Sequence, residues 1–129
     1  MEELVCTMKT TDSELASNIR SRVFEILELI SDERAQRSYQ DRAPMVQVSS
    51  ELFNQWEDVH HPDTEEWQLA FDQPERSVLR SFNMAFEEVC EVTPQLLPPL
   101  SEFIGTEALR IYRDAAKSAL EELGSTERR

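Results

Sequence analysis

Apolar residues recur at intervals of three and four in three long stretches of the chain, which is the spacing of one helix face. The stretches follow Thr11, Asp72 and Thr106. The longest run that alternates between apolar and polar residues is 45–48, too short to indicate a sheet. Only two glycines occur, whereas a β-rich fold of this length needs many at its turns. The pattern therefore predicts an all-α fold, a compact single-domain bundle of three long and about two short helices.

Capping residues predict where these helices begin and end. Thr11-Asp12-Ser13-Glu14 has the spacing of a capping box at the start of the first helix. Asp72 stands two residues before Pro74, which is typical of a helix start. Thr106 is expected to cap the last helix, and Gly124 is expected to follow its final turn as a C′ glycine.

The first helix has two possible ends in the sequence. It either continues to about Arg42 or kinks near Ser31, and Ala43-Pro44 ends it in both cases. The two short helices are expected to start at Ser49 or Ser50 and at Asp63 or Thr64.

The prolines of residues 94–100 exclude a regular helix there and predict a proline-rich elbow. Because Leu96, Leu97 and Leu100 are apolar, we expect this elbow to be ordered and partly buried. Residues 1–129 form one domain in this interpretation, and residues 1–10 and 125–129 are expected to be mobile tails.

The net charge of −13 limits the kinds of partner that the protein is expected to bind. Nucleic acids and anionic membranes are bound by clusters of Lys and Arg, so neither is an expected partner, whereas a basic protein is. Cys6 and Cys90 are too few for a disulfide framework, and the acidic N-terminus does not resemble a signal peptide. A cytoplasmic location follows as an expectation, and the oligomeric state stays open.

Residues 43–75, here called the acidic segment, carry most of this charge. They hold eight acidic residues and no lysine or arginine, together with both tryptophans and both histidines. Tryptophan is common in binding hot spots, although its positions on amphipathic stretches favour a mainly structural role for both rings. The residues predicted to bind a partner are Glu51, Trp56, Glu57, Asp58, Asp63, Glu65, Glu66 and Trp67.

The same segment offers two alternative functions. Glu57 and His60 have the Glu-x-x-His spacing of metal ligands on a helix, and Asp63 with Asp58 could complete a single metal site. A di-iron site of the ferritin type needs more histidines than the chain has. His60 equally suits the end of a helix, where a protonated imidazole is favoured. A small-molecule pocket is the other alternative, and it is expected beside Trp56, Trp67, Phe82 and Phe86.

No catalytic residue is predicted. Cys90 lies on an apolar stripe among glutamates, which disfavours a thiolate, and neither a nucleophile elbow nor a phosphate-binding loop occurs. The sequence therefore predicts a non-catalytic acidic interaction module without a cofactor. Its concrete form is a bacterial immunity or antitoxin-type inhibitor, in which carboxylates take the place of the phosphates that a basic nuclease binds.

Overall fold

Seven helices and no strand make up the part of the chain that the computed structural model describes, which is the backbone of residues 2–93 and 96–127 and the side chains of 13–93 and 96–124. The predicted all-α bundle with three long helices is confirmed, with four short helices in place of about two. None of these helices combines the length and the apolar content needed to cross a membrane. The helices are α1 (Glu2–Ser31), α2 (Glu33–Arg42), α3 (Val48–Val59), α4 (Glu65–Ala70), α5 (Gln73–Val92), α6 (Leu100–Phe103) and α7 (Glu107–Glu127).

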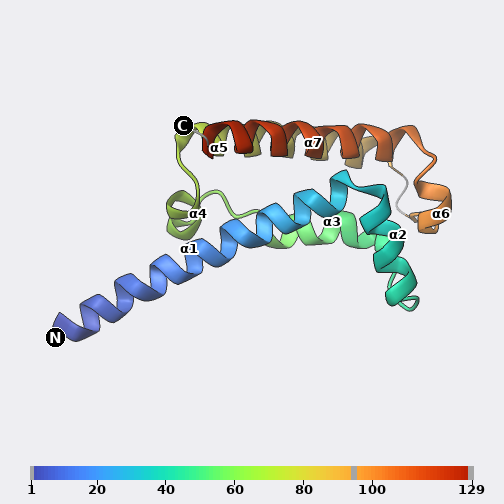
Figure 1. The fold of residues 1–129 in the computed structure, drawn as a ribbon. Coiled ribbons are helices and arrows are strands. Elements are labelled where there is room, and N and C mark those ends of the chain that lie inside the picture. The colour runs from blue at the N-terminus through green and yellow to red at the C-terminus, as the bar shows by residue number, and fades with distance from the viewer. Residues whose placement is uncertain (1, 94–95, 128–129) are drawn as a thin grey trace.

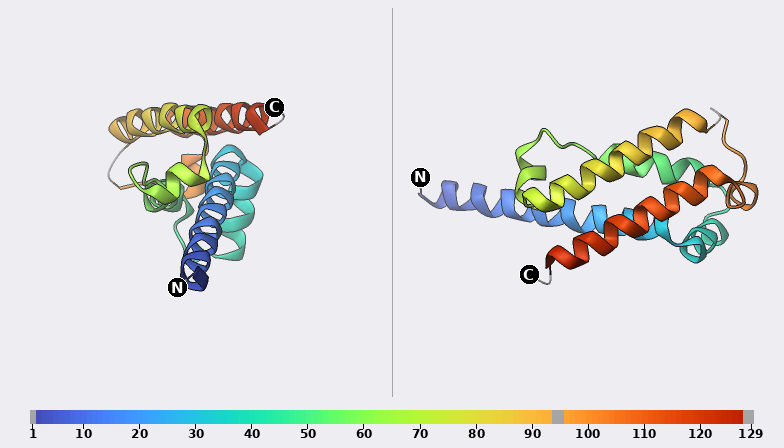
Figure 2. Two further views of the ribbon diagram at one scale, coloured as in Figure 1. Left: turned by 90° about the vertical axis from the view of Figure 1, so that its left-hand side faces the viewer. Right: turned by 90° about the horizontal axis from the view of Figure 1, so that it is seen from above.

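The long helices form two layers (Figure 1). Helices α5 and α7 lie above α1 and α3, and the view from above in Figure 2 shows α5 and α7 side by side in opposite directions. Helix α7 packs against both α5 and α1, and α1 also packs against α4 and α3, so α1 and α7 connect the layers. Helices α2 and α6 lie at one end of the bundle and α4 at the other.

An aromatic cluster fills the space between the layers. The ring of Tyr112 on α7 stacks on Phe53 of α3 with ring centroids 4.9 Å apart, and Phe82 and Phe86 of α5 pack around it. Tyr112 is fully buried, and its hydroxyl donates a hydrogen bond of 2.7 Å to the Leu52 carbonyl. This bond satisfies the one polar atom of a side chain that otherwise contributes apolar area to the core.

Most predicted helix ends are confirmed. Asp72 forms a capping box with Glu75, since each side chain accepts a hydrogen bond from the other's backbone N–H. Thr106 Oγ1 accepts from the Leu109 N–H at the start of α7, and Thr64 caps α4 in the same way. The first helix ends at Ser31, which is one of the two ends that the sequence allowed. It ends there because the carboxylate of Asp32 caps the start of α2.

Three predicted helix ends are wrong. Helix α3 begins at Val48 with Gln47 as its N-cap, so neither Ser49 nor Ser50 caps it. Helix α1 begins at Glu2, so Thr11 lies within it and does not start it; the Thr11 side chain is outside the described residues. Acidic residues at a helix N-terminus are favoured by its dipole, and no Gly or Pro interrupts residues 2–14. Helix α7 continues through Gly124 to Glu127, and that glycine has no positive φ, so it is not a C′ residue. The mobility of residues 1–10 and 125–129 stays a prediction.

The proline-rich elbow is anchored to the start of α3 in its described part, which begins at residue 96. Ser49 Oγ donates to the Pro98 carbonyl at 2.8 Å, and Gln47 donates to the carbonyl of Leu97 at 2.9 Å. Leu100 is buried, as expected, but Leu96 is 90% exposed, so the elbow is less buried than its leucines indicate.

An ion pair ties α1 to the corner between α4 and α5. Arg20 donates to both carboxylate oxygens of Glu75, at 3.0 and 2.8 Å, and to the Ala70 carbonyl at the end of α4. Its guanidinium also lies over the rings of Phe24 and Phe71, about the distance at which a cation–π contact forms. Glu75 is only 5% exposed, so its charge depends on this bidentate partner.

We expect Glu75→Gln to lower the free energy of unfolding by about 2 kcal/mol, because it removes the buried negative charge that accepts two hydrogen bonds from Arg20. Glu25→Gln is the matched control, since Glu25 pairs with Arg22 on the exposed surface and should contribute less than about 0.5 kcal/mol. Urea denaturation of both variants measures the difference. If both variants lost the same free energy of unfolding, the Glu75–Arg20 pair would contribute no more stability than an exposed ion pair.

Candidate functional site

The acidic segment forms α3, α4 and the loops around them, and it presents most of its carboxylates to solvent. Glu51 and Glu66 are half-buried, and Glu75 is buried. The exposed members are Glu57, Asp58, Asp63, Glu65 and Asp72.

Most of these carboxylates have no ion-pair partner among the described residues. Among the described side chains, Glu75 is the one residue of the eight that forms an ion pair. Elsewhere, carboxylates such as Glu33 and Glu107 pair with arginines on their own or neighbouring helices. Within the described part of the chain, Glu75 is thus the one carboxylate of the segment whose charge an ion pair compensates.

The structure extends this acidic surface onto α5. Partial burial raises the pKa of the Cys90 thiol, and the carboxylates of Glu57 and Glu87 raise it further. Glu57 comes from α3 and Glu87 from α5, so two helices contribute to one negative field. Nothing in the sequence distinguishes Glu87 from its neighbour Glu88, because only packing places it beside α3. Cys90 itself is exposed, so it does not belong to the buried apolar stripe of α5 on which the sequence placed it.

Both tryptophans of the predicted partner-binding set lie in the core. Trp56 is fully buried and Trp67 is 2% exposed, so neither ring can anchor a partner at the surface. Trp56 packs edge-to-face on Phe82 and donates its indole N–H to the Asn83 side chain at 3.0 Å. The amphipathic placement of both tryptophans already favoured this structural role. The prediction that their rings bind a partner is wrong, because both are core residues.

The predicted metal site does not form. No group of three His, Cys, Asp or Glu side chains comes together anywhere in the described part of the chain. His60 stacks on Trp56 with ring centroids 4.9 Å apart, and His61 makes a hydrogen bond of 2.8 Å to the Asp58 carbonyl. Helix α3 ends at Val59, so His60 and Asp63 lie beyond the helix that carries Glu57.

The environment of His60 favours its neutral form. Burial lowers the pKa of His60 from 6.5, and the nearby His61 lowers it further, while Glu87 and Asp63 act in the opposite direction. The imidazole therefore carries little charge at neutral pH.

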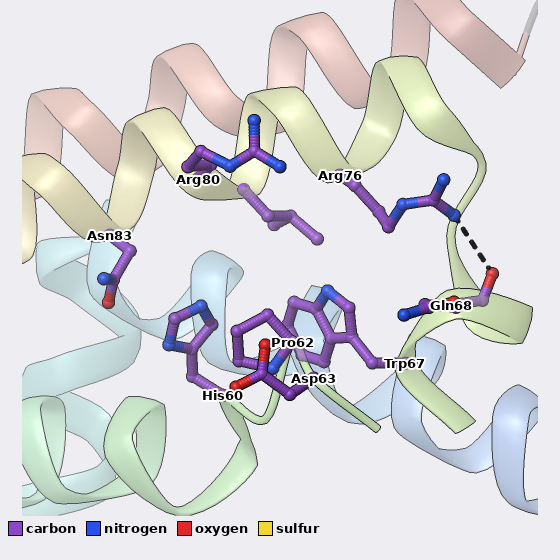
Figure 3. A pocket seen from close by; sticks show the side chains of 9 residues that line it. His60, Pro62, Asp63, Trp67, Gln68, Arg76, Arg80 and Asn83 are labelled. Carbon is purple, nitrogen blue, oxygen red and sulfur yellow. Dashed lines mark hydrogen bonds between the residues drawn. The ribbon is translucent and has the colours of Figure 1, made fainter. Parts of the chain in front are cut away.

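A pocket of about 410 Å³ opens between the loop after α3, helix α4 and helix α5. We call it the Trp67 pocket. Figure 3 shows its side chains, with Arg76 and Arg80 along one edge and Trp67 opposite. Its lining residues are His60, Pro62, Asp63, Trp67, Gln68, Arg76, Leu79, Arg80 and Asn83.

Helix α5 supplies the polar edge of this pocket. Arg76, Arg80 and Asn83 stand at i, i+4 and i+7, which places them on one helix face. Arg76 is held in place because its Nη1 donates to the carbonyls of Phe71 and Gln68, at 2.7 and 3.2 Å, at the end of α4. Sequence reasoning missed both arginines, although their helical spacing was a usable signal.

The pocket differs from the one expected from the aromatic residues. Of the four side chains predicted to line it, only Trp67 does so. Trp56, Phe82 and Phe86 are buried in the aromatic core, where they pack on one another and on Tyr112.

No protein-family model, curated protein or solved structure gives a significant match to this chain.

We expect acid to destabilise the native protein relative to His60→Gln. Because the folded-state pKa of His60 lies below 6.5, the unfolded chain binds a proton first as the pH falls, so stability is lost below about pH 6.5. Urea midpoints of both proteins at about pH 7.5 and about pH 5.5 measure this. If the native protein became more stable relative to the variant at the lower pH, the lowered pKa of His60 would be contradicted.

Removing either carboxylate near Cys90 should activate its thiol. In a Cys6→Ser background, Glu57→Gln or Glu87→Gln should lower the Cys90 pKa and speed alkylation by iodoacetamide roughly twofold near pH 8. Glu65→Gln, on α4, is the control and should leave the rate unchanged. Equal acceleration by the control would mean that overall charge, and not this pair of carboxylates, acts on the thiol.

Proposed function

We propose that this chain is a non-catalytic interaction module that binds a basic protein partner through the exposed carboxylates of the acidic segment. The observation that supports it is the absence of counterions: within the described side chains, seven of the eight acidic residues of the segment have no ion-pair partner. Like charges held close together raise the free energy of the isolated protein. A basic partner would remove that repulsion on binding.

The buried tryptophans make the proposed interface electrostatic in character. With Trp56 and Trp67 in the core, the exposed surface of the segment offers carboxylates without an aromatic anchor. Charged contacts at an exposed surface speed association and set specificity more than they add affinity. Binding should therefore be fast and strongly dependent on ionic strength.

Within this class, an inhibitor of a nuclease is the form that we propose. A nuclease presents cationic side chains where it holds the phosphate backbone. Carboxylates from α3, α4 and α5, including Glu57, Glu65 and Glu87, would occupy the phosphate positions and block the substrate. This is the mode of inhibition that we propose for an immunity or antitoxin-type protein.

The test is affinity capture with two variants of equal charge. Replacing Glu57, Asp58, Glu65 and Glu66 by their amides should abolish capture of the basic partner, whereas the same replacement of Glu88, Glu91, Glu121 and Glu122 should preserve it. The native protein should retain the partner at about 50 mM salt and release it at about 500 mM. Mass spectrometry identifies the captured protein.

The matched variants separate a specific surface from general acidity. If both lose the partner equally, net charge alone explains the binding. If capture does not depend on salt, or if the first variant still binds, the acidic segment is not the interface. A captured partner with nuclease activity that the native protein inhibits would support the inhibitor.

A further inference from the structure

The indole N–H of Trp67 is not fully buried, and it has no acceptor among the described residues. The side chain is 2% exposed, and no described residue accepts a hydrogen bond from its Nε1. Figure 3 shows this nitrogen facing α5 across the Trp67 pocket. The other tryptophan has its donor satisfied by Asn83. Because this nitrogen faces the pocket and is not sealed from it, water or a ligand in the pocket can accept its hydrogen bond.

Two guanidinium groups face the same space. Arg76 uses Nη1 for the two carbonyls at the end of α4, which leaves Nε and Nη2 available. Arg80 is exposed, and no carboxylate of a described residue lies within ion-pair distance of it. Paired arginines at i and i+4 repel each other unless an anion lies between them.

The pocket is cationic although the protein is strongly acidic. Its charged side chains are Arg76, Arg80 and Asp63, and the neighbouring His60 is neutral at pH 7 because burial lowers its pKa. A net charge near +1 suits a ligand of low negative charge better than a polyphosphate.

The size and the walls of the pocket indicate an organic ligand. Its volume of about 410 Å³ falls in the range of small-molecule sites and exceeds what a bare inorganic anion fills. Pro62 provides exposed apolar surface between the charged groups, and the edges of Trp67 and Leu79, which are 2% and 1% exposed, also reach the pocket.

We propose that the Trp67 pocket binds a small organic oxyanion, a carboxylate or phosphate monoester with a flat apolar body. The oxyanion lies between Arg76 and Arg80 and accepts the indole N–H of Trp67. The apolar body lies against Pro62 and the exposed edge of Trp67. The arginines of this site come from α5, and of the exposed carboxylates proposed to bind a basic protein only Asp63 lines it.

Nuclear magnetic resonance tests this directly, because the chain has only two indole N–H signals. The probes are benzoate, phenyl phosphate and inorganic phosphate. Benzoate or phenyl phosphate should shift the Trp67 indole signal saturably, and the tighter of the two identifies the preferred headgroup. Inorganic phosphate should bind at least about tenfold more weakly, because it lacks the apolar body.

Matched arginine variants provide the control. Arg80→Gln should weaken the organic probe roughly tenfold, since it removes a charge-assisted hydrogen bond. Arg34→Gln, on α2 outside the pocket, should leave the affinity unchanged. The proposal is overturned if neither organic probe shifts the Trp67 signal saturably, if inorganic phosphate binds equally well, or if Arg80→Gln binds like the native protein.

Discussion

The contact between Arg20 and Glu75 is the constraint on which the rest of this structure depends. Glu75 has two roles, because it closes the capping box that starts α5 and accepts both hydrogen bonds from Arg20 of α1. Arg20 also holds the last carbonyl of α4, at Ala70. One buried carboxylate therefore fixes the directions of α1, α4 and α5 relative to one another. The Trp67 pocket lies at this corner, so its geometry depends on the same pair.

The structure separates the charges of this protein into two kinds. The ion pairs on α1, α2 and α7 compensate carboxylates within the fold, whereas the acidic segment keeps its charge exposed. Close to that exposed charge, α5 presents Arg76 and Arg80 to the Trp67 pocket without neutralising the segment. Asp63 of the segment lines the same pocket, but it forms no ion pair with either arginine. Two surfaces of opposite sign can thus serve different ligands.

Local sequence signals predicted the long helices correctly, but they predicted only some of the helix ends. The predicted N-caps Asp72, Thr64 and Thr106 are confirmed. A cap can be predicted from sequence because it depends on hydrogen bonds to residues two or three positions away. Thr11 and Gly124 were wrong because a residue that can end a helix can also lie inside one when the flanking residues continue it. The side chains predicted as a metal site failed for a different reason. Spacing in sequence does not specify where a chain turns after a helix ends.

The sequence alone determined that this protein is an all-α bundle with its charge concentrated in residues 43–75, because periodicity, capping and composition are properties of neighbouring residues. Only the tertiary structure decided that Trp56 and Trp67 are core residues and that Glu87 joins the acidic surface. It also brought Arg76 and Arg80 opposite the unpaired donor of Trp67. Burial and pairing depend on which faces of distant helices meet. The bond between Arg20 and Glu75, which joins residues 55 positions apart, is of this kind.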